Sequence, residues 1–443
     1  MEVKSATMSR QPFLEMPLHL LRIVLSDLDC MDSLAAAILS HSSFYVAFSE
    51  DSTNIISRIL GNQIPVDLLP YSIAVYEATR IDHCNSDHIM KLLLRFFSEI
   101  SPPSQDVLRL EHLEPAAAKV ISKTHSIVEH FSHDFVKKTL PLTRNKLGLY
   151  RPDYSQASAG EVFRIRRALY RFQLYCNLQA GGKQRDTSSL YQQYFFFGLF
   201  SPWVNEQLAC IHDYLEQVLS SAFDKVAAHD VEWGARSVNW LLRGRHNEYK
   251  QGFLSYGLDF LFKLSHVAQS YDERLQILEA EDLPNTKNML AAHFKRATIV
   301  EDPVYYPKYF AVLGQWGTDD LELLRNPKTD GPIDDSSSGP FRMWHEAHKE
   351  CYVYGVVYAE EHSRLRRCGY VLWDAPERPI EGGLRDRLHE ARRQRLIDHL
   401  ELSEAGEQMR RSWEERAEIY RRGGRGFWSE GDLSGIVWSE AAS

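Results

Sequence analysis

Apolar residues recur at helical spacing near the start of the chain, and polar residues interrupt them. A spacing of one, three, one and three residues places five apolar side chains on one helical face: Leu20, Leu21, Val24, Leu25 and Leu28. Pro17 stands where a first-turn proline is tolerated, because its missing N–H would have no helical partner. Three aspartates then break the pattern and are candidate cap or turn residues: Asp27, Asp29 and Asp32.

Two more short helices are predicted directly after the first. One carries Leu34, Ile38 and Leu39. The other begins near Ser42 or Ser43 and carries Phe44, Tyr45 and Phe48. Three short helices in about 35 residues cannot bury a self-sufficient core, because domains that small need staples or a partner. We therefore expect this helical hairpin to pack on another surface.

Helical spacing dominates the rest of the chain as well. Ser158 and Glu161 form a capping-box pattern, and Ser201-Pro202 opens the strongest amphipathic helix. No period-two strand pattern persists, and no hairpin signal separates two β-rich runs. The predicted fold class is all-α, with a three-helix N-terminal hairpin on an irregular multi-helix body. Its predicted helices lie near 52–60, 66–80, 87–100, 115–138, 161–178, 202–223, 253–280, 286–298, 341–374 and 384–422.

One stretch with a loop composition divides this helical body. Residues 326–340, with sequence NPKTDGPIDDSSSGP, combine proline, glycine, aspartate and serine, which is typical of a flexible linker. The expected organisation is a motif over 12–50, a helical body over 51–325, the linker over 326–340 and a C-terminal helical region over 341–443.

Composition and charge exclude several classes of protein. The chain has 443 residues, of which 44% are hydrophobic and 25% charged, which is ordinary for a globular protein. Its net charge of −9 argues against a whole-chain affinity for nucleic acid. No apolar run is long enough for a membrane span, and residues 1–16 lack the apolar core of a secretory signal. The six cysteines are scattered without a CxxC pair, which favours a reduced cytoplasmic or nuclear setting.

The N-terminal stretch resembles an F-box. Met16-Pro17 stands for the family's Leu-Pro, Leu20-Leu21 for its paired leucines, and Phe44-Tyr45 for its aromatic end. Val24, Leu28 and Leu34 occupy the spaced apolar sites, whereas His19 replaces the usual acidic residue and Ser42 a common basic one. Segments such as RFQLYCNL and LRRCGYVLWD look like those of fungal F-box-like proteins with helical bodies.

The resemblance implies a partner and a set of contact residues. An F-box binds the small adaptor subunit of an SCF ubiquitin ligase and, through it, a cullin. Carried over residue by residue, the adaptor-binding positions are Met16, Pro17, Leu20, Leu21, Val24, Leu28, Leu34, Ile38 and Phe44. The target protein that such a subunit would recruit is not implied.

Histidine and arginine clusters are the remaining candidates for chemistry. His345-Glu346-Ala347-His348 is one residue short of the zincin motif and is interpreted as a polar helix surface. The histidines near His83-Cys84 and His125 lack the paired spacing of a zinc site and are interpreted as surface or capping residues. Four arginines on one predicted helix suggest an internal ion-pair network or a solvated face: Arg164, Arg166, Arg167 and Arg171.

These patterns leave two functional hypotheses from different classes. No nucleotide, hydrolase or kinase motif occurs, so we expect no enzyme activity, metal or cofactor. The first hypothesis is a non-catalytic, substrate-recruiting F-box adaptor of an SCF ligase. The alternative is a stand-alone helical protein-binding or structural protein. Exposure separates them, because an open apolar patch formed by Leu20, Leu21, Val24 and Leu28 favours the box and a sealed one disfavours it.

Overall fold

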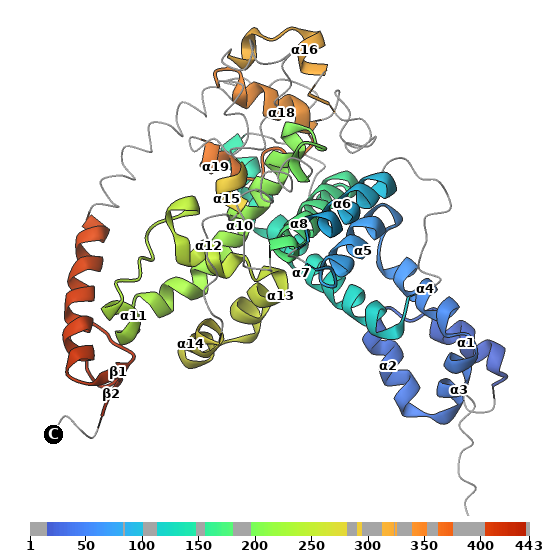
Figure 1. Cartoon of the computed structure of the whole chain (residues 1–443), viewed down its shortest axis with the longest axis horizontal. Helices are drawn as coiled ribbons and strands as arrows, with labels where there is room; N and C mark the ends of the chain where they lie inside the picture. The colour runs from blue at the N-terminus through green and yellow to red at the C-terminus, as the bar shows by residue number, and fades with distance from the viewer. Residues whose placement is uncertain are drawn as a thin grey trace, which may run out of the picture.

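The computed structural model of the chain is an arch of helices (Figure 1). Residues 16–50 form one foot, the helix over 404–421 with strands β1 and β2 forms the other, and α16 and α18 lie at the top. The structure describes residues 16–82, 85–100, 113–147, 156–179, 196–280, 290–294, 312–322, 324–325, 339–351, 362–374 and 404–439.

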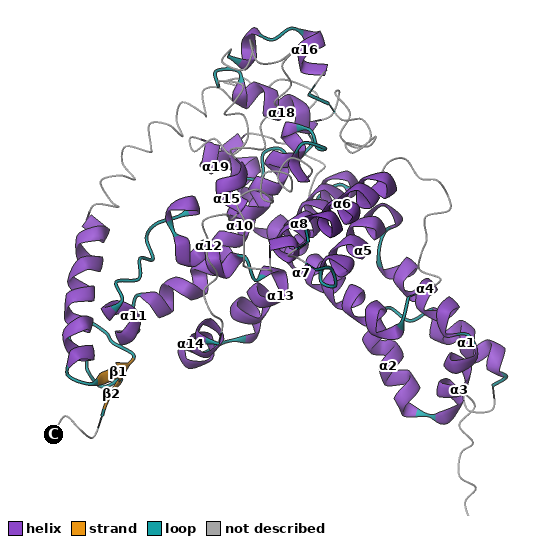
Figure 2. Cartoon of the chain, in the orientation of Figure 1, coloured by secondary structure: helices purple, strands orange, loops and turns teal. Residues whose placement is uncertain are grey.

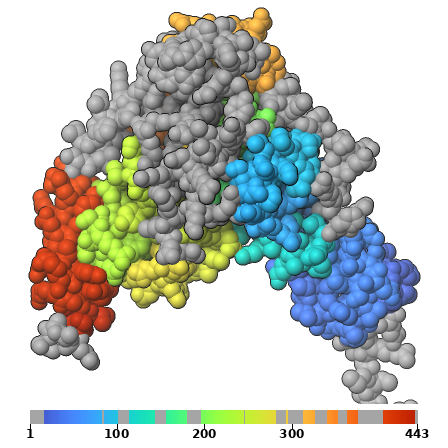
Figure 3. Space-filling view, in the orientation of Figure 1, coloured from blue at the N-terminus to red at the C-terminus, as the bar shows by residue number. Residues whose placement is uncertain are grey.

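The first foot consists of the three predicted short helices, here called the N-terminal unit (residues 16–50). They are α1 (Leu18–Ser26), α2 (Met31–Ser40) and α3 (Ser42–Glu50). Pro17 is the residue before α1 rather than inside it, and its carbonyl accepts the first helical hydrogen bond from the N–H of Leu20 at 2.9 Å. The unit projects from the rest of the molecule in the space-filling view (Figure 3).

Five helical segments connect the N-terminal unit to the body. They are α4 (Ser52–Gln63), the 3-10 turn η2 (Val66–Leu68), α5 (Leu69–Ala78), α6 (Ser86–Ile100) and α7 (Pro115–Leu147). All correspond to predicted helices, but α7 is longer than expected and passes through Pro141. The apolar interiors of the N-terminal unit and the body form one continuous cluster of buried residues, in which Leu21 and Leu34 lie with Ile55 and Phe131.

The centre of the arch is built by α8 (Ala159–Gln179) and α10 (Pro202–Ala227). The predicted capping box is present, because the N–H of Ser158 donates to Glu161 at 2.7 Å and the N–H of Glu161 donates to the Ser158 hydroxyl at 3.1 Å. Pro202 is the first residue of α10, as the Ser-Pro pair predicted. A capping box therefore starts α8, and a proline at the first helical position starts α10.

The segment after α10 is broken where one helix over 253–280 was predicted. Its pieces are α11 (Val231–Ala235), η4 (Gly244–His246), α12 (Glu248–Leu254), α13 (Gly257–Phe262), the π-helical turn η5 (Lys263–Val267) and α14 (Tyr271–Glu279). Gly257 has a φ of +79° and marks the first break. Ser270 and Glu273 form a second capping box, which starts α14. Short pieces let this segment wrap around α10.

The chain after α14 forms further short helices, and one of them changes a predicted boundary. They are α15 (Leu290–His293), η9 (Leu313–Gln315), α16 (Thr318–Glu322), α18 (Gly339–His348) and α19 (Ser363–Arg366). Gly339 and Pro340 begin α18, so the predicted linker over 326–340 is wrong at its C-terminal end. Its residues 326–338 lie outside the described residues.

The second foot contains a small sheet that the sequence did not predict. A helix covers residues 404–421, and Gly423, whose φ is +87°, turns the chain after it. The next residues form β1 (Gly424–Gly426), which pairs in antiparallel fashion with β2 (Ile436–Trp438). These strands are three residues each and are the only strands in the described part of the chain (Figure 2). The all-α fold class is otherwise confirmed.

Candidate protein-binding surface and buried charge network

The N-terminal unit buries a small set of apolar side chains and leaves another set exposed. Its interior consists of Leu21, Leu25, Met31, Leu34 and Ala47, each at most 5% exposed. The spacing of Leu21 and Leu25 on α1, and of Met31 and Leu34 on α2, points both helices toward α3 and α4. Among residues 16–50 the one buried polar residue is Ser26. The unit is therefore held together by apolar packing.

The predicted adaptor-binding residues do not form one open patch. Pro17 and Leu20 are exposed, whereas Leu21 and Leu34 are each 1% exposed. The remaining five are half-buried: Met16, Val24, Leu28, Ile38 and Phe44. Leu21 and Leu34 therefore belong to the interior and cannot touch a partner without opening the unit. Residues at helical spacing include those in the centre of the buried face and those at its edge. Spacing alone does not distinguish the two positions.

A different apolar set faces outward from the same three helices. The exposed fractions are 38% for Leu20, 54% for Ile23, 87% for Leu39, 59% for Tyr45 and 43% for Val46. These are five of the fifteen large apolar side chains that are exposed in the described part of the chain. The sequence does contain a sign that Ile23 is exposed: it lies off the apolar stripe of its helix, at a position where a charged or polar residue is usual.

A groove lies between α1 and α4 beside this surface. It has a volume of about 730 Å³ and is lined by apolar Ile23, Val66 and Leu69 and by basic Arg22 and Arg58. Arg22 pairs with Glu50 at the end of α3, whereas Arg58 has no carboxylate partner among the described residues. A concave, partly apolar surface with an unpaired cation is suited to a protein partner with acidic and apolar side chains.

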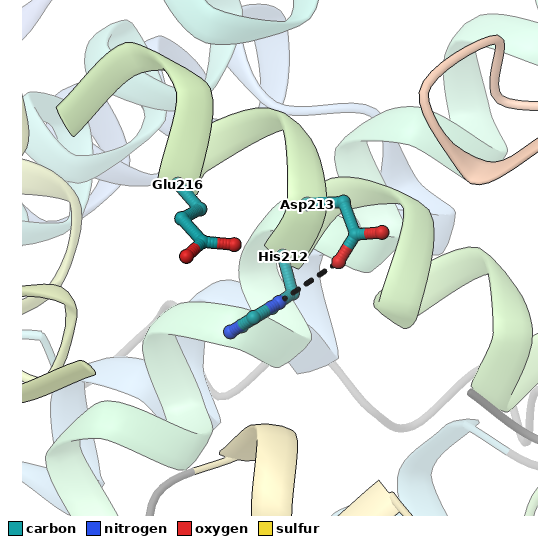
Figure 4. A group of neighbouring side chains, drawn as sticks. All are labelled: His212, Asp213 and Glu216. Atoms are coloured by element: carbon teal, nitrogen blue, oxygen red, sulfur yellow. Dashed lines mark hydrogen bonds and ion pairs between the residues drawn. The ribbon is translucent and has the colours of Figure 1, made fainter. Parts of the chain in front are cut away.

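The centre of the arch has the opposite character, because α10 buries charged side chains. His212, Asp213 and Glu216 follow one another along α10, and Figure 4 shows Asp213 beside the His212 ring. The ring nitrogen Nδ1 of His212 lies 3.2 Å from Oδ1 of Asp213, and Nε2 lies 3.1 Å from Oε1 of Gln251. Because Nδ1 faces a carboxylate, which can only accept, Nδ1 carries a proton and donates it to Asp213.

The pKa values of this pair follow from burial and from mutual attraction. Burial alone would lower the pKa of His212, but the hydrogen bond and charge of Asp213 outweigh it and raise that pKa. Burial alone would raise the pKa of Asp213, but Arg366 and His212 outweigh it and lower that pKa. Burial is the dominant cause for Glu216, whose pKa is raised.

Basic side chains from other elements complete the network. Nε of Arg366, on α19, donates to Oδ2 of Asp213 at 2.7 Å, and its Nη1 lies 3.7 Å from Oε1 of Glu206. The hydroxyl of Tyr370 also donates to Glu206, at 3.1 Å. Lys250, from α12, donates to Asp224 at 2.8 Å. The network thus ties α12 and residues 362–374 to α10.

The same arrangement does not suit a metal ion, although three possible ligand atoms of His212, Asp213 and Glu216 lie within 4.8 Å of one another. A divalent cation would need the His212 nitrogen that already carries a proton toward Asp213. It would also lie near the guanidinium of Arg366, which already neutralises Asp213. We interpret the cluster as structural.

The arginines of α8 extend this internal network. Arg164 donates to Asp374 at 2.8 Å, Arg167 to Gln207 at 2.6 Å, and Arg171 to Asn205 at 2.8 Å and to the carbonyl of Val204 at 2.9 Å. Each of these three arginines is at most 2% exposed. The solvated-face alternative is therefore wrong for these three arginines. The predicted ion pair is confirmed for Arg164, whereas Arg167 and Arg171 donate to neutral amide and carbonyl groups.

Two histidine predictions need correction. His348 is fully buried, not on a polar surface: its Nδ1 donates to the carbonyl of Trp344 at 2.8 Å, and its Nε2 accepts from Nδ1 of His362 at 3.1 Å. His125 is also buried, with its Nδ1 2.8 Å from the Tyr170 hydroxyl. Burial lowers the pKa of His348 to about 3 and that of His125 to about 4. His83 and Cys84 lie outside the described residues.

Comparisons of the chain with known protein-family models, with curated protein sequences and with solved structures each returned no match. Within the described residues, none of the helices combines the length and the apolar character that crossing a bilayer requires.

Proposed function

We propose that the protein is a non-catalytic, substrate-recruiting subunit of an SCF ubiquitin ligase. Its N-terminal unit would bind the small adaptor of the ligase, in the cytoplasm or nucleus, and through that adaptor a cullin. The helical body would hold a target protein near the charged ubiquitin. Holding the two reactants together is the whole mechanism, because orientation alone can supply a large part of a rate enhancement.

One observation carries the proposal: exposed apolar side chains are concentrated on a projecting three-helix unit at the position of the F-box resemblance. Isolated exposed leucines are normal on any protein, but a concentration of them marks an interaction site. The contact surface we propose is the outward set of the N-terminal unit: Pro17, Leu20, Ile23, Leu39, Tyr45 and Val46. The buried residues Leu21 and Leu34 would support this surface from inside.

A second function is favoured by the continuous core. Because Leu21, Leu25 and Leu34 join the same buried cluster as the body, the N-terminal unit also fits a stand-alone helical protein-binding or structural protein. In that case the three helices complete the fold, and the exposed side chains serve another partner or none.

The experiment that separates the two uses purified full-length chain and purified SCF adaptor subunit. Wild type should bind at micromolar concentration, and Leu20→Asp or Tyr45→Asp should abolish binding, since an anchor residue typically contributes about 2 kcal/mol or more. Leu94→Asp is the matched control, because Leu94 is 51% exposed on α6, away from the unit. A wild-type chain that ignores the adaptor leaves the stand-alone function as the better account.

A further inference from the structure

Two histidine rings meet where the π-helical turn η5 packs on α7. His130, on α7, and His266, on η5, have ring centroids 4.0 Å apart and planes at 85°. The ring of Phe262 lies 5.0 Å from that of His130 and 5.4 Å from that of His266, and Phe131 also packs on His130. Both histidines are half-buried, so protons from solvent can reach them. The pair is therefore a titratable contact between two elements in an aromatic setting.

The hydrogen bonds of the two rings show what an added proton would meet. The Ser265 hydroxyl donates to the Leu261 carbonyl at 2.6 Å, so its oxygen accepts from Nδ1 of His266 at 2.7 Å. Neutral His266 therefore has an unprotonated Nε2, which is its site of protonation. Nε2 of His130 is buried and has no hydrogen-bond partner among the described residues. In a charged His130 ring this nitrogen carries a proton, and that donor would lack an acceptor.

Burial and neighbouring charges hold both rings neutral near pH 7. Burial is the largest cause and lowers the pKa of His130 and that of His266. Lys138, on α7, lowers both pKa values further, whereas Asp134 raises them. The Asp134 carboxylate is already shared, because it accepts from the Tyr214 hydroxyl of α10 at 2.5 Å and from Lys138 at 2.7 Å. It therefore offsets only part of the cost of charging the histidines.

Other charged groups beside the contact do not compensate a protonated ring. His133, which is exposed on α7, lowers the pKa of His130 when it is itself charged. Lys263, on η5, and Lys123, on α7, both pair with Asp259 of α13, at 2.7 Å and 2.6 Å. These ion pairs contain no histidine, so α13 stays tied to α7 at a pH where the histidines become charged.

Few other contacts hold η5 in place. Of its five residues only Leu264 is buried, and Val267 is 60% exposed. Segments with few buried apolar side chains open locally at low cost, and single π-helical turns occur often at functional sites. The next helix, α14, is anchored separately, because its Tyr271 hydroxyl donates to Asp230 at 2.7 Å. The turn η5 can therefore open while α13 and α14 on either side remain folded.

We propose that His130 and His266 form a proton-operated latch, which keeps η5 on α7 while both rings are neutral and releases it on acidification. In the released state each ring is in water, where its pKa is near 6.5, so that state binds more protons than the closed one. The closed state is therefore fully favoured above pH 6.5 and is lost as the pH falls below it. Because the rings lie 4.0 Å apart, a charge on one opposes a charge on the other, and they titrate as a coupled pair.

The latch is independent of the proposed ligase function. Both histidines belong to the helical body, outside the N-terminal unit, so the chain can bind the ligase adaptor without a latch or have a latch without binding the adaptor.

Hydrogen exchange of the full chain tests the latch. Protection of the amides of residues 263–267 should fall roughly tenfold or more between pH 7.5 and 5.5, beyond the change in intrinsic exchange, because each extra proton bound by the open state contributes up to about tenfold per pH unit. His130→Phe combined with His266→Gln should remove this dependence. His88→Gln is the control, since His88 is exposed on α6. Protection that is constant with pH in wild type, or that falls equally in the double variant, overturns the proposal.

A second test leaves both rings in place. Lys138→Glu replaces a cation that lowers both pKa values by an anion, so the acid loss of protection should become about two to three times smaller. Lys137→Glu is the matched control, because it makes the same change in net charge at the next position of α7, and Lys137 is not among the groups that act on either histidine. An acid response that is the same in these two variants would mean that the response does not pass through the histidine pair, and it overturns the proposal.

Discussion

The N-terminal unit and the α8–α10 centre distribute polar and apolar side chains in opposite ways. Residues 16–50 bury one polar residue, Ser26, and expose five large apolar side chains. Helices α8 and α10 expose no large apolar side chain and bury charged residues from both helices: Glu161, Arg164, Arg167, Arg171, Glu206, Asp213 and Glu216. The first region keeps apolar surface available for a partner, whereas the second uses ion pairs to join elements far apart in the sequence.

The largest expected effect comes from breaking the buried network. Arg366→Ala removes the cation that faces Asp213 and Glu206 and leaves two carboxylates buried without it. Removing one partner of a buried ion pair costs about 3–5 kcal/mol, so the denaturation midpoint should fall sharply. Arg410→Ala is the matched control: Arg410 pairs with Glu407, both are more than half exposed, and the cost should stay below about 1 kcal/mol.

A double-mutant cycle decides whether Asp213 is the relevant partner. Combined with Asp213→Asn, Arg366→Met should cost less than the sum of the single changes, because neither charge is then left alone. If the free energies of unfolding simply add, then Asp213 and Arg366 do not stabilise each other.

The second prediction separates the two leucines that spacing grouped together. Leu21→Ala leaves a cavity under α1 and should cost about 2–5 kcal/mol of stability. Leu20→Ala, at a 38% exposed position, should change stability by less than about 0.5 kcal/mol while weakening adaptor binding. Urea denaturation and adaptor binding of the two variants check this. Equal stability losses would mean that Leu20 is also part of the interior.

The sequence predicted local features well and tertiary ones poorly. Capping at Ser158 and the start of α10 at Pro202 depend on neighbouring residues, so the pattern contained the necessary information. The burial of His348 depends on His362 and residues around it that are distant in sequence, and no spacing rule reports that. The exposure of residues in the candidate site could not be predicted for the same reason. Leu21 is buried and Ile23 exposed because α3 and α4 pack on one side of α1 and not on the other.

The third prediction concerns how stability depends on pH. It uses the lowered pKa of a buried histidine, a kind of residue that the N-terminal unit does not contain. Unfolded histidine takes up a proton near pH 6.5, whereas folded His348 does so at about 3. Below pH 6.5 the unfolded state therefore binds more protons, so stability is full above this pH and is lost as the pH falls. The loss should be about 1.4 kcal/mol per pH unit for this group.

His348→Gln removes the group that takes up this proton on unfolding. The free energy of unfolding should therefore depend less steeply on pH between pH 6 and 4, by the slope that corresponds to one proton. Its stability at pH 8 measures the packing cost separately, because both states of wild type are then neutral at this position. An unchanged slope would show that other groups set the acid sensitivity. The buried His125, with its pKa lowered to about 4, is the next candidate.

The smallest expected effect compares two helical glycines, one beside the N-terminal unit and one beside a buried charge. Gly61 lies inside α4, which continues to Gln63 rather than ending near residue 60 as predicted. A Cβ at Gly61 would meet nothing within 4 Å. Gly61→Ala should therefore stabilise the protein by about 0.5–1 kcal/mol, since alanine loses less conformational freedom in a helix. At Gly234 in α11 a Cβ would lie 2.5 Å from Nε of Arg416, which is fully buried. Gly234→Ala should destabilise by about 1–3 kcal/mol, because that guanidinium has to move. If the denaturation midpoint rises for both variants, the Arg416 side chain moves aside at little cost, and its buried position does not constrain α11.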